Sequence, residues 1–137
     1  MKLRIFLAVL AAILTAGFFF TAPAQAQEQT PGFSIERLAV ARGIENREPV
    51  GIAETFSADT PVVYCFIEAK SIEADTRVTV AWIHEGKEIH SISLPLKAGP
   101  RWRTRSEKTL YGLTGAWSIE IRDEGGKVLK QTSFKVE

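Results

Sequence analysis

The sequence predicts an all-β fold, an immunoglobulin-like β-sandwich of seven to eight antiparallel strands. Beyond residue 33, apolar side chains recur at every second position, which is the period of a half-buried strand. Glycine, proline, aspartate and threonine interrupt these runs at short spacing, and no run there has the apolar spacing of a long helix. We therefore expect one sandwich domain over residues 34–137, without an internal repeat or a linker.

The expected domain opens with a strand, a charged connector and a short edge strand. Leu38 and Val40 alternate with small or polar residues in Ile35–Ala41, as a half-buried strand requires. Arg42–Pro49 is rich in charge, so we expect a connector there, and Pro49 suits a strand edge or a loop because it lacks an amide donor. Val50–Phe56 alternates again and predicts a short edge strand.

The next segment, Val62–Ala69, is apolar on both faces and is the expected central strand. Cys65, the single cysteine, belongs to its series of small and apolar residues. We expect a packed thiol, with an intermolecular disulfide as the alternative. Tyr64 and Phe66 then face the other side of the sheet. Either Ile35–Ala41 covers them there, or they form an exposed apolar patch that binds a partner.

Further strands follow, and their alternation indicates which side chains face the core. Trp82 with Val80 and Trp117 with Ile119 are expected to point inward. Two adjacent glycines in Asp123–Gly126 predict a hairpin turn, because glycine adopts a positive φ at no steric cost. The expected strands are Thr76–His84, Lys87–Leu96, Arg101–Thr109, Ala116–Arg122 and Val128–Val136.

The N-terminus, residues 1–26, has the three parts of a secretory signal peptide. Lys2 and Arg4 precede a long uncharged apolar run, and an Ala-x-Ala pattern ends at Ala26. The apolar run is shorter than the roughly 20 residues that span a bilayer as a helix. We therefore expect a signal helix cleaved after Ala26, a periplasmic or secreted domain, and no membrane span after cleavage. Retention of the segment as an anchor is the alternative. Residues 27–33 are expected to form a flexible lead.

Charge and motifs exclude several classes of protein. Loss of the signal segment lowers Lys plus Arg from 17 to 15 against 16 Asp plus Glu, a net charge of about −1, which excludes a basic nucleic-acid binder. A single cysteine excludes an intramolecular disulfide framework and a cysteine-rich metal site. The Gly-x-Ser-x-Gly, His-Glu-x-x-His and phosphate-loop motifs are absent from the sequence. We expect a non-catalytic protein without a cofactor.

Arg101, Arg103 and Arg105 form the most specific surface feature. On a strand, their guanidinium groups project from one face at intervals of about 6.6 Å. Such groups suit carboxylates and phosphates, so the strip predicts a site for an acidic glycan, a lipid head group or an acidic protein. Trp102 points the opposite way and is expected in the core. The alternative is a solvated face in which the arginines pair with carboxylates such as Glu54, Glu68 or Glu120.

The charged segment that contains Arg47 and Glu48 is the second candidate. Burial cannot hold so polar a loop, so hydrogen bonds or an ion pair between Arg47 and a carboxylate must fix its conformation. We expect either a structural clasp or a binding loop at this position.

His84 and His90 raise the question of a metal site. If Trp82 pairs with His90 and His84 with Glu88, the loop Glu85–Lys87 has three residues and all three candidate ligands share a face. Two histidines and a glutamate suit zinc. A two-residue turn instead sends the histidines to opposite faces. Since no further strong ligand is evident, we expect no metal and keep the site as an alternative.

Several short elements occur in order along the domain: Glu45–Val50, Val63–Phe66, Trp82 with Gly86 and Lys87, Trp102–Thr104 with Ser106 and Lys108, and Gly115 with Trp117. Over roughly Arg42–Val136 they resemble the bacterial domain-of-unknown-function family 2914. The resemblance implies a small all-β extracytoplasmic domain without an assigned activity, and it supplies no catalytic residues.

Together these observations predict an exported, non-catalytic accessory or binding module of the cell envelope. Its expected partner is an envelope protein or an anionic cell-wall glycan. A small periplasmic metal-binding protein or enzyme that uses His84 and His90 with a carboxylate is the alternative, and strand addition at a sheet edge is a third possibility. The candidate contacts are Arg101, Arg103, Arg105, Arg47, Glu48, Tyr64 and Phe66.

Overall fold

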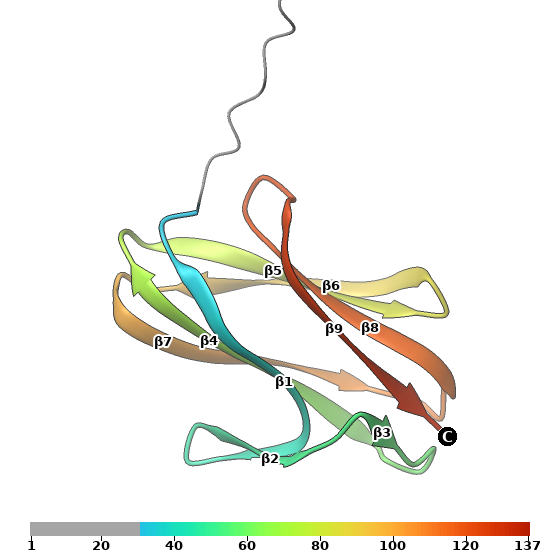
Figure 1. Cartoon of the computed structure of the whole chain (residues 1–137). Helices are drawn as coiled ribbons and strands as arrows, with labels where there is room; N and C mark the ends of the chain where they lie inside the picture. Colours follow the sequence, from blue (N-terminus) through green and yellow to red (C-terminus); the bar gives the residue numbers. More distant parts are fainter. Residues whose placement is uncertain (1–30) are drawn as a thin grey trace, which may run out of the picture.

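Two packed β-sheets make up the computed structural model, which describes residues 31–137 (Figure 1). One sheet has the strand order β2-β1-β4-β7 and the other the order β3-β9-β8-β5-β6. No helix occurs within the described residues, and none there is long and apolar enough to cross a membrane. The predicted all-β sandwich is confirmed. The predicted signal peptide (1–26) and most of the predicted lead lie outside the described residues.

The structure has nine strands in this part of the chain, one more than the sequence predicts. The bounds of the last five differ from the predicted ones by at most two residues. The strands are β1 (Ser34–Glu45), β2 (Glu48–Ile52), β3 (Thr55–Phe56), β4 (Val62–Ile72), β5 (Thr76–His84), β6 (Lys87–Leu96), β7 (Gly99–Thr109), β8 (Gly115–Arg122) and β9 (Val128–Val136).

The predicted connector Arg42–Pro49 is wrong, because this segment is a β-hairpin. It forms the end of β1 and the start of β2, with Glu45 paired to Glu48. Asn46 and Arg47 make the turn with φ values of 50° and 61°. This left-handed pair is the two-residue turn whose twist matches the flanking strands. The sequence does not reveal this hairpin by alternating apolar residues, because ion pairs rather than apolar burial hold the hairpin in place.

The predicted edge strand Val50–Phe56 is divided between the two sheets. Its first part belongs to β2, which pairs with β1. Its last part is β3, which pairs in parallel with β9 through Thr55 opposite Lys135 and Phe56 opposite Val136. A chain that passes from one sheet to the other helps to close a corner of the sandwich.

Aromatic side chains fill the space between the sheets. Trp117 stacks on Phe134 with ring centroids 5.7 Å apart, and Trp82 meets the same ring edge-on at 6.4 Å. The Trp82 indole nitrogen donates a buried hydrogen bond of 3.0 Å to the Ser106 hydroxyl, which joins β5 to β7 across the core. The inward faces predicted for β5 and β8 are confirmed.

Cys65 lies in this core with no exposed surface, and burial raises the pKa of its thiol to about 12. The prediction of a packed thiol is therefore confirmed, since a thiol at this depth has no access to another chain. At the start of the described residues, Phe33 packs partly buried against the same core, and the Gly32 carbonyl accepts a hydrogen bond of 2.8 Å from the Glu73 amide.

The β5–β6 turn differs from the predicted three-residue loop. Glu85 and Gly86 alone form the turn, with φ values of 49° and 77°, and Lys87 lies opposite His84. A register shift on β6 follows, and it restores the predicted pairing of Trp82 with His90. The extra residue of a β-bulge thus compensates for the shorter turn.

Candidate anion-binding groove

The outer face of the four-stranded sheet carries a row of charged residues. Side chains alternate along β4, so Phe66 and Glu68 face away from the buried Cys65. Glu68 lies directly between Arg37 of β1 and Arg103 of β7. Cross-strand neighbours of opposite charge attract one another, and this row places a carboxylate between two arginines.

Glu48 fastens the β1–β2 hairpin over this face. Its carboxylate accepts hydrogen bonds of 2.8 and 2.9 Å from the two terminal nitrogens of Arg37, and one of 2.6 Å from Nη1 of Arg103. Arg103 lies on β7, at the opposite edge of the sheet from β2. The hairpin must therefore fold back over the outer face of the sheet for Glu48 to reach Arg103. Figure 1 shows the hairpin beneath β4 and β7. The hydrogen bond from Arg37 is the main reason that the pKa of Glu48 falls to about 2.

Glu68 is the second carboxylate of this network. Its side chain is buried, accepts a hydrogen bond from Nε of Arg37, and lies 3.7 Å from Nη1 of Arg101. Three arginines therefore share two carboxylates, and the cluster keeps a net positive charge. The hydrogen bonds to Glu48 and Glu68 raise the pKa of Arg37 above its ordinary value, so it stays charged.

Phe66 lies beneath this cluster rather than on the surface. Its side chain is buried, and the Arg37 guanidinium stands 4.8 Å from the centre of its ring, a cation–π distance. Of the two alternatives for Tyr64 and Phe66, coverage by Ile35–Ala41 is confirmed for Phe66, because Arg37 of that segment lies over its ring, and the exposed apolar patch does not form there. Tyr64 stays partly exposed, with the Arg105 guanidinium 5.9 Å from its ring centre.

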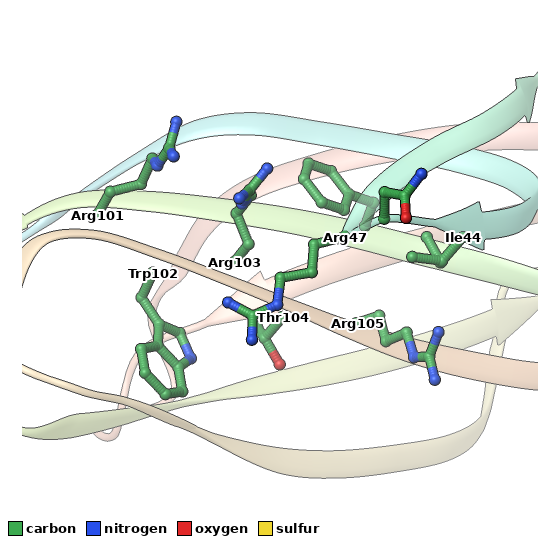
Figure 2. Close-up of a pocket in the computed structure, with 9 residues that line it drawn as sticks. Ile44, Arg47, Arg101, Trp102, Arg103, Thr104 and Arg105 are labelled. Atoms are coloured by element: carbon green, nitrogen blue, oxygen red, sulfur yellow. The ribbon is translucent and has the colours of Figure 1, made fainter.

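A groove of about 790 Å³ lies between the hairpin and β7 (Figure 2). Arg47 extends from the hairpin turn across it toward β7, and Arg101 and Arg103 project from one side of that strand. Its volume falls within the range of small-ligand sites, about 300–1,000 Å³. The groove is lined by Ile44, Asn46, Arg47, Phe66, Arg101, Trp102, Arg103, Thr104 and Arg105.

Two of the lining arginines have no carboxylate partner among residues 31–137. Arg47 and Arg105 are both exposed and make no ion pair in this part of the chain, whereas Arg103 is bound to Glu48 and only 21% exposed. Arg101 has one long contact with Glu68. The groove therefore offers two uncompensated guanidinium groups, with a third only weakly engaged.

All four arginines that the sequence singled out, Arg47, Arg101, Arg103 and Arg105, line the groove, but they differ in their contacts. Arg103 and Glu48 hold the hairpin, whereas Arg47 and Arg105 face open solvent. Among the predicted carboxylate partners, Glu68 pairs with the strip, and Glu120 instead pairs with Arg122. Sequence reasoning missed Arg37, whose position opposite Glu68 depends on a register shift in β1.

Trp102 is half-buried and packs against the core, as its position opposite the arginines predicts. Its indole nitrogen is buried without a hydrogen-bond partner in the described part of the chain.

His84, His90 and Glu88 do not form the metal site that the sequence offered as an alternative. His84 forms a 2.7 Å hydrogen bond with the Thr114 carbonyl, and its ring lies tilted against Trp117 with the ring centroids 4.7 Å apart, while Glu88 forms an ion pair of 2.6 Å with Arg122. These partners engage His84 and Glu88 in two separate places. Within residues 31–137, no group of three or more His, Cys, Asp or Glu side chains is placed to hold a metal ion.

Residues 75–136 match the model of a family described as "Protein of unknown function (DUF2914)". This segment belongs to the DUF2914 family. The DUF2914 match runs from β5 to β9 and so includes Arg101, Arg103 and Arg105, while the hairpin with Arg47 and Glu48 precedes it. The groove is therefore built from a DUF2914 strand and from a hairpin outside the matched segment.

Two solved structures illustrate what this chain resembles in fold. The β-glucosidase from Listeria innocua in complex with glucose has a TM-score of 0.47 and 10% identity over 76% of this chain and 15% of its own. The selenomethionine-labelled β-glucosidase from Kluyveromyces marxianus has a TM-score of 0.46 and 10% identity over 80% and 15%. The chain thus spans about 15% of the length of these enzymes, and we draw nothing about activity from them. A comparison with curated proteins gives no match.

Proposed function

We propose that this domain is a non-catalytic binding module that holds an anionic partner in the groove between the β1–β2 hairpin and β7. The uncompensated charges of Arg47 and Arg105 carry this proposal. The carboxylates nearest to the groove are already engaged with Arg37 and Arg103. An added carboxylate or phosphate would find guanidinium donors that no carboxylate within residues 31–137 must first release.

The conformation of Arg47 supports the same assignment. Its φ of 61° lies in the left-handed region, where the second turn residue is usually glycine. A long side chain here is less favourable than glycine, and it extends over the groove (Figure 2). Backbone strain of this kind is often found at binding sites.

We also propose that the protein works in the cell envelope. The support lies in the N-terminal sequence, where Lys2 and Arg4, an apolar run and the Ala-x-Ala pattern at Ala26 are typical of a cleaved export signal. In that compartment the candidate partners are envelope proteins with acidic segments and anionic cell-wall glycans, which both present anionic groups to the groove.

Binding of two polyanions, poly-L-glutamate and polygalacturonate, tests the groove. The double variant Arg47→Gln/Arg105→Gln removes the two free charges, and Arg77→Gln together with Lys127→Gln removes the same charge elsewhere on the surface. We expect the groove variant to bind at least one polyanion about tenfold more weakly than the control, with affinity falling as salt rises. Equal binding by both variants, or no binding by the native domain to either polyanion, would overturn the proposal.

A further inference from the structure

We infer that the anionic partner is an extended acidic polypeptide segment that adds to β7 as a further strand. The inference rests on the function proposed above and names the class of partner. It combines the exposed edge of β7, the course of the groove along that edge, and the spacing of the arginines.

β7 is the longest sheet edge of the described domain. It pairs with β4 on one side, and no strand within residues 31–137 pairs with its other side. The four edge strands β7, β6, β2 and β3 have 11, 10, 5 and 2 residues. Pro100 lacks an amide donor, so Arg101–Thr109 is the part of β7 best able to accept a partner strand.

The groove follows this edge. Side chains of successive strand residues point to opposite faces, and yet five consecutive residues, Arg101 to Arg105, all line the groove. Figure 2 shows Arg101 and Arg103 on one side of the strand and Trp102 on the other. A cavity in contact with both sides of one strand runs beside its backbone, where an added strand would form its hydrogen bonds.

The arginines define which strand fits. Residues directly opposite in neighbouring strands have Cβ atoms about 4.5–5.5 Å apart, within reach of a charge-assisted pair. Arg101 and Arg105 are four positions apart on the same face and have little or no carboxylate compensation. A partner strand with acidic residues at positions i and i+4 would pair with both. Arg47, from the hairpin on the far side of the groove, lies toward the same strand.

The same charges select against other occupants. Charged side chains on an edge discourage pairing with an ordinary apolar strand, and two copies of β7 would bring like charges together. The β6 edge has no comparable charge, since Glu88 is engaged with Arg122 and Lys87 stands alone at its start. Charge complementarity therefore favours an acidic strand at β7 over a second copy of the chain or pairing at β6.

Backbone methylation distinguishes strand addition from simple charge attraction. The probe is a nine-residue peptide of alternating threonine and glutamate, with two derivatives N-methylated on one or the other set of alternate residues. In an added strand only one set faces the β7 backbone. We expect that derivative to bind at least about tenfold more weakly than the parent peptide, because it loses several backbone hydrogen bonds, while the other derivative binds like the parent. Equal affinities for the two derivatives would overturn the inference.

A charge exchange locates the peptide on β7. The variant Arg105→Glu should bind the glutamate peptide more weakly and recover binding to one of a series of peptides in which lysine replaces a single glutamate at a time, whereas Arg77→Glu on β5 should leave these affinities unchanged. Recovery by one lysine peptide supports the register, and its absence counts against it. If polygalacturonate binds in an Arg47- and Arg105-dependent way while the peptide does not, the proposed function stands and the partner is a glycan. If neither binds, both proposals fail.

Discussion

Glu48 of β2 and Arg37 of β1 form a two-point ion pair, with nitrogen–oxygen distances of 2.8 and 2.9 Å, that holds the β1–β2 hairpin against the outer face of its own sheet. The hairpin places Arg47 over the groove, so this pair sets the position of a candidate ligand contact. It therefore links the stability of the hairpin to binding.

Replacing this carboxylate should release the hairpin without unfolding the sandwich. In Glu48→Gln, the guanidinium groups of Arg37 and Arg103 lose their shared anion. We expect amide hydrogen exchange to become several-fold faster across Gly43–Val50, while β5 and β8 remain protected. Glu124→Gln, in the exposed β8–β9 turn, is the matched control and should leave both regions as they are. Unchanged exchange in the hairpin would show that other contacts hold it.

Acid should release the same hairpin. The pKa of Glu48 falls from its ordinary value of 4.5 to about 2 in the folded protein. A carboxyl group with a lowered pKa stabilises the fold above the ordinary value, and its contribution disappears as pH falls through the lower one. We expect the amide NMR signals of Asn46 and Arg47 to shift between about pH 4.5 and 2, with no such step in Glu48→Gln. A step with its midpoint near 4.5 would contradict the ion pairing.

Cys65 should be unreactive in the folded domain. Burial raises the pKa of its thiol to about 12, and the side chain has no exposed surface. Because the thiolate is the reactive form, a disulfide reagent at neutral pH should modify Cys65 only after unfolding in denaturant. Rapid modification under native conditions, or a disulfide-linked dimer on a non-reducing gel, would contradict this placement.

The buried hydrogen bond between Trp82 and Ser106 should contribute measurably to stability. In Ser106→Ala the indole N–H loses its acceptor in the core, which should lower the free energy of unfolding by about 1–3 kcal/mol. Ser118→Ala, on the outer face of β8, is a suitable control. Denaturant unfolding followed by tryptophan fluorescence gives the difference, and equal stability of the two variants would mean that water satisfies the donor.

Gly115 should resist substitution for two separable reasons. Its φ of 109° is unfavourable for other residues, and the Glu85 carboxylate occupies the place where a Cβ would lie. That carboxylate also accepts a 2.7 Å hydrogen bond from the Ala116 amide. We expect Gly115→Ala to cost about 1–3 kcal/mol, and more than Gly126→Ala, where φ is 87° but the space is open. Equal losses would show that Glu85 moves aside freely.

Much of the fold follows from the alternation of apolar residues. Val80, Trp82 and Ile119 point inward as their spacing predicts, because one buried face fixes the register of a strand. The β1–β2 hairpin does not follow from it, since residues distant in sequence, Arg37 and Arg103, provide its anchors. The local sequence pattern shows where a strand can form, but it does not show which distant residue pairs with a charged side chain on that strand.

The candidate site was predictable only in part, for the same reason. The alternation of Arg101, Arg103 and Arg105 places them on one face of a strand. Nothing along the chain indicates that Glu48 engages Arg103 and leaves Arg105 without a partner. That difference, which separates a structural arginine from a candidate ligand contact, depends on how the hairpin folds over the sheet.

The parallel pairing of β3 with β9 has a consequence for the way this domain folds. Phe56 and Val136 lie side by side although 136 − 56 = 80 residues separate them along the chain. A nascent polypeptide cannot complete its hydrophobic interior until its final residues are available, so folding must follow synthesis of the whole domain. Such non-local topology is typical of slow folders, with time constants of about milliseconds to seconds.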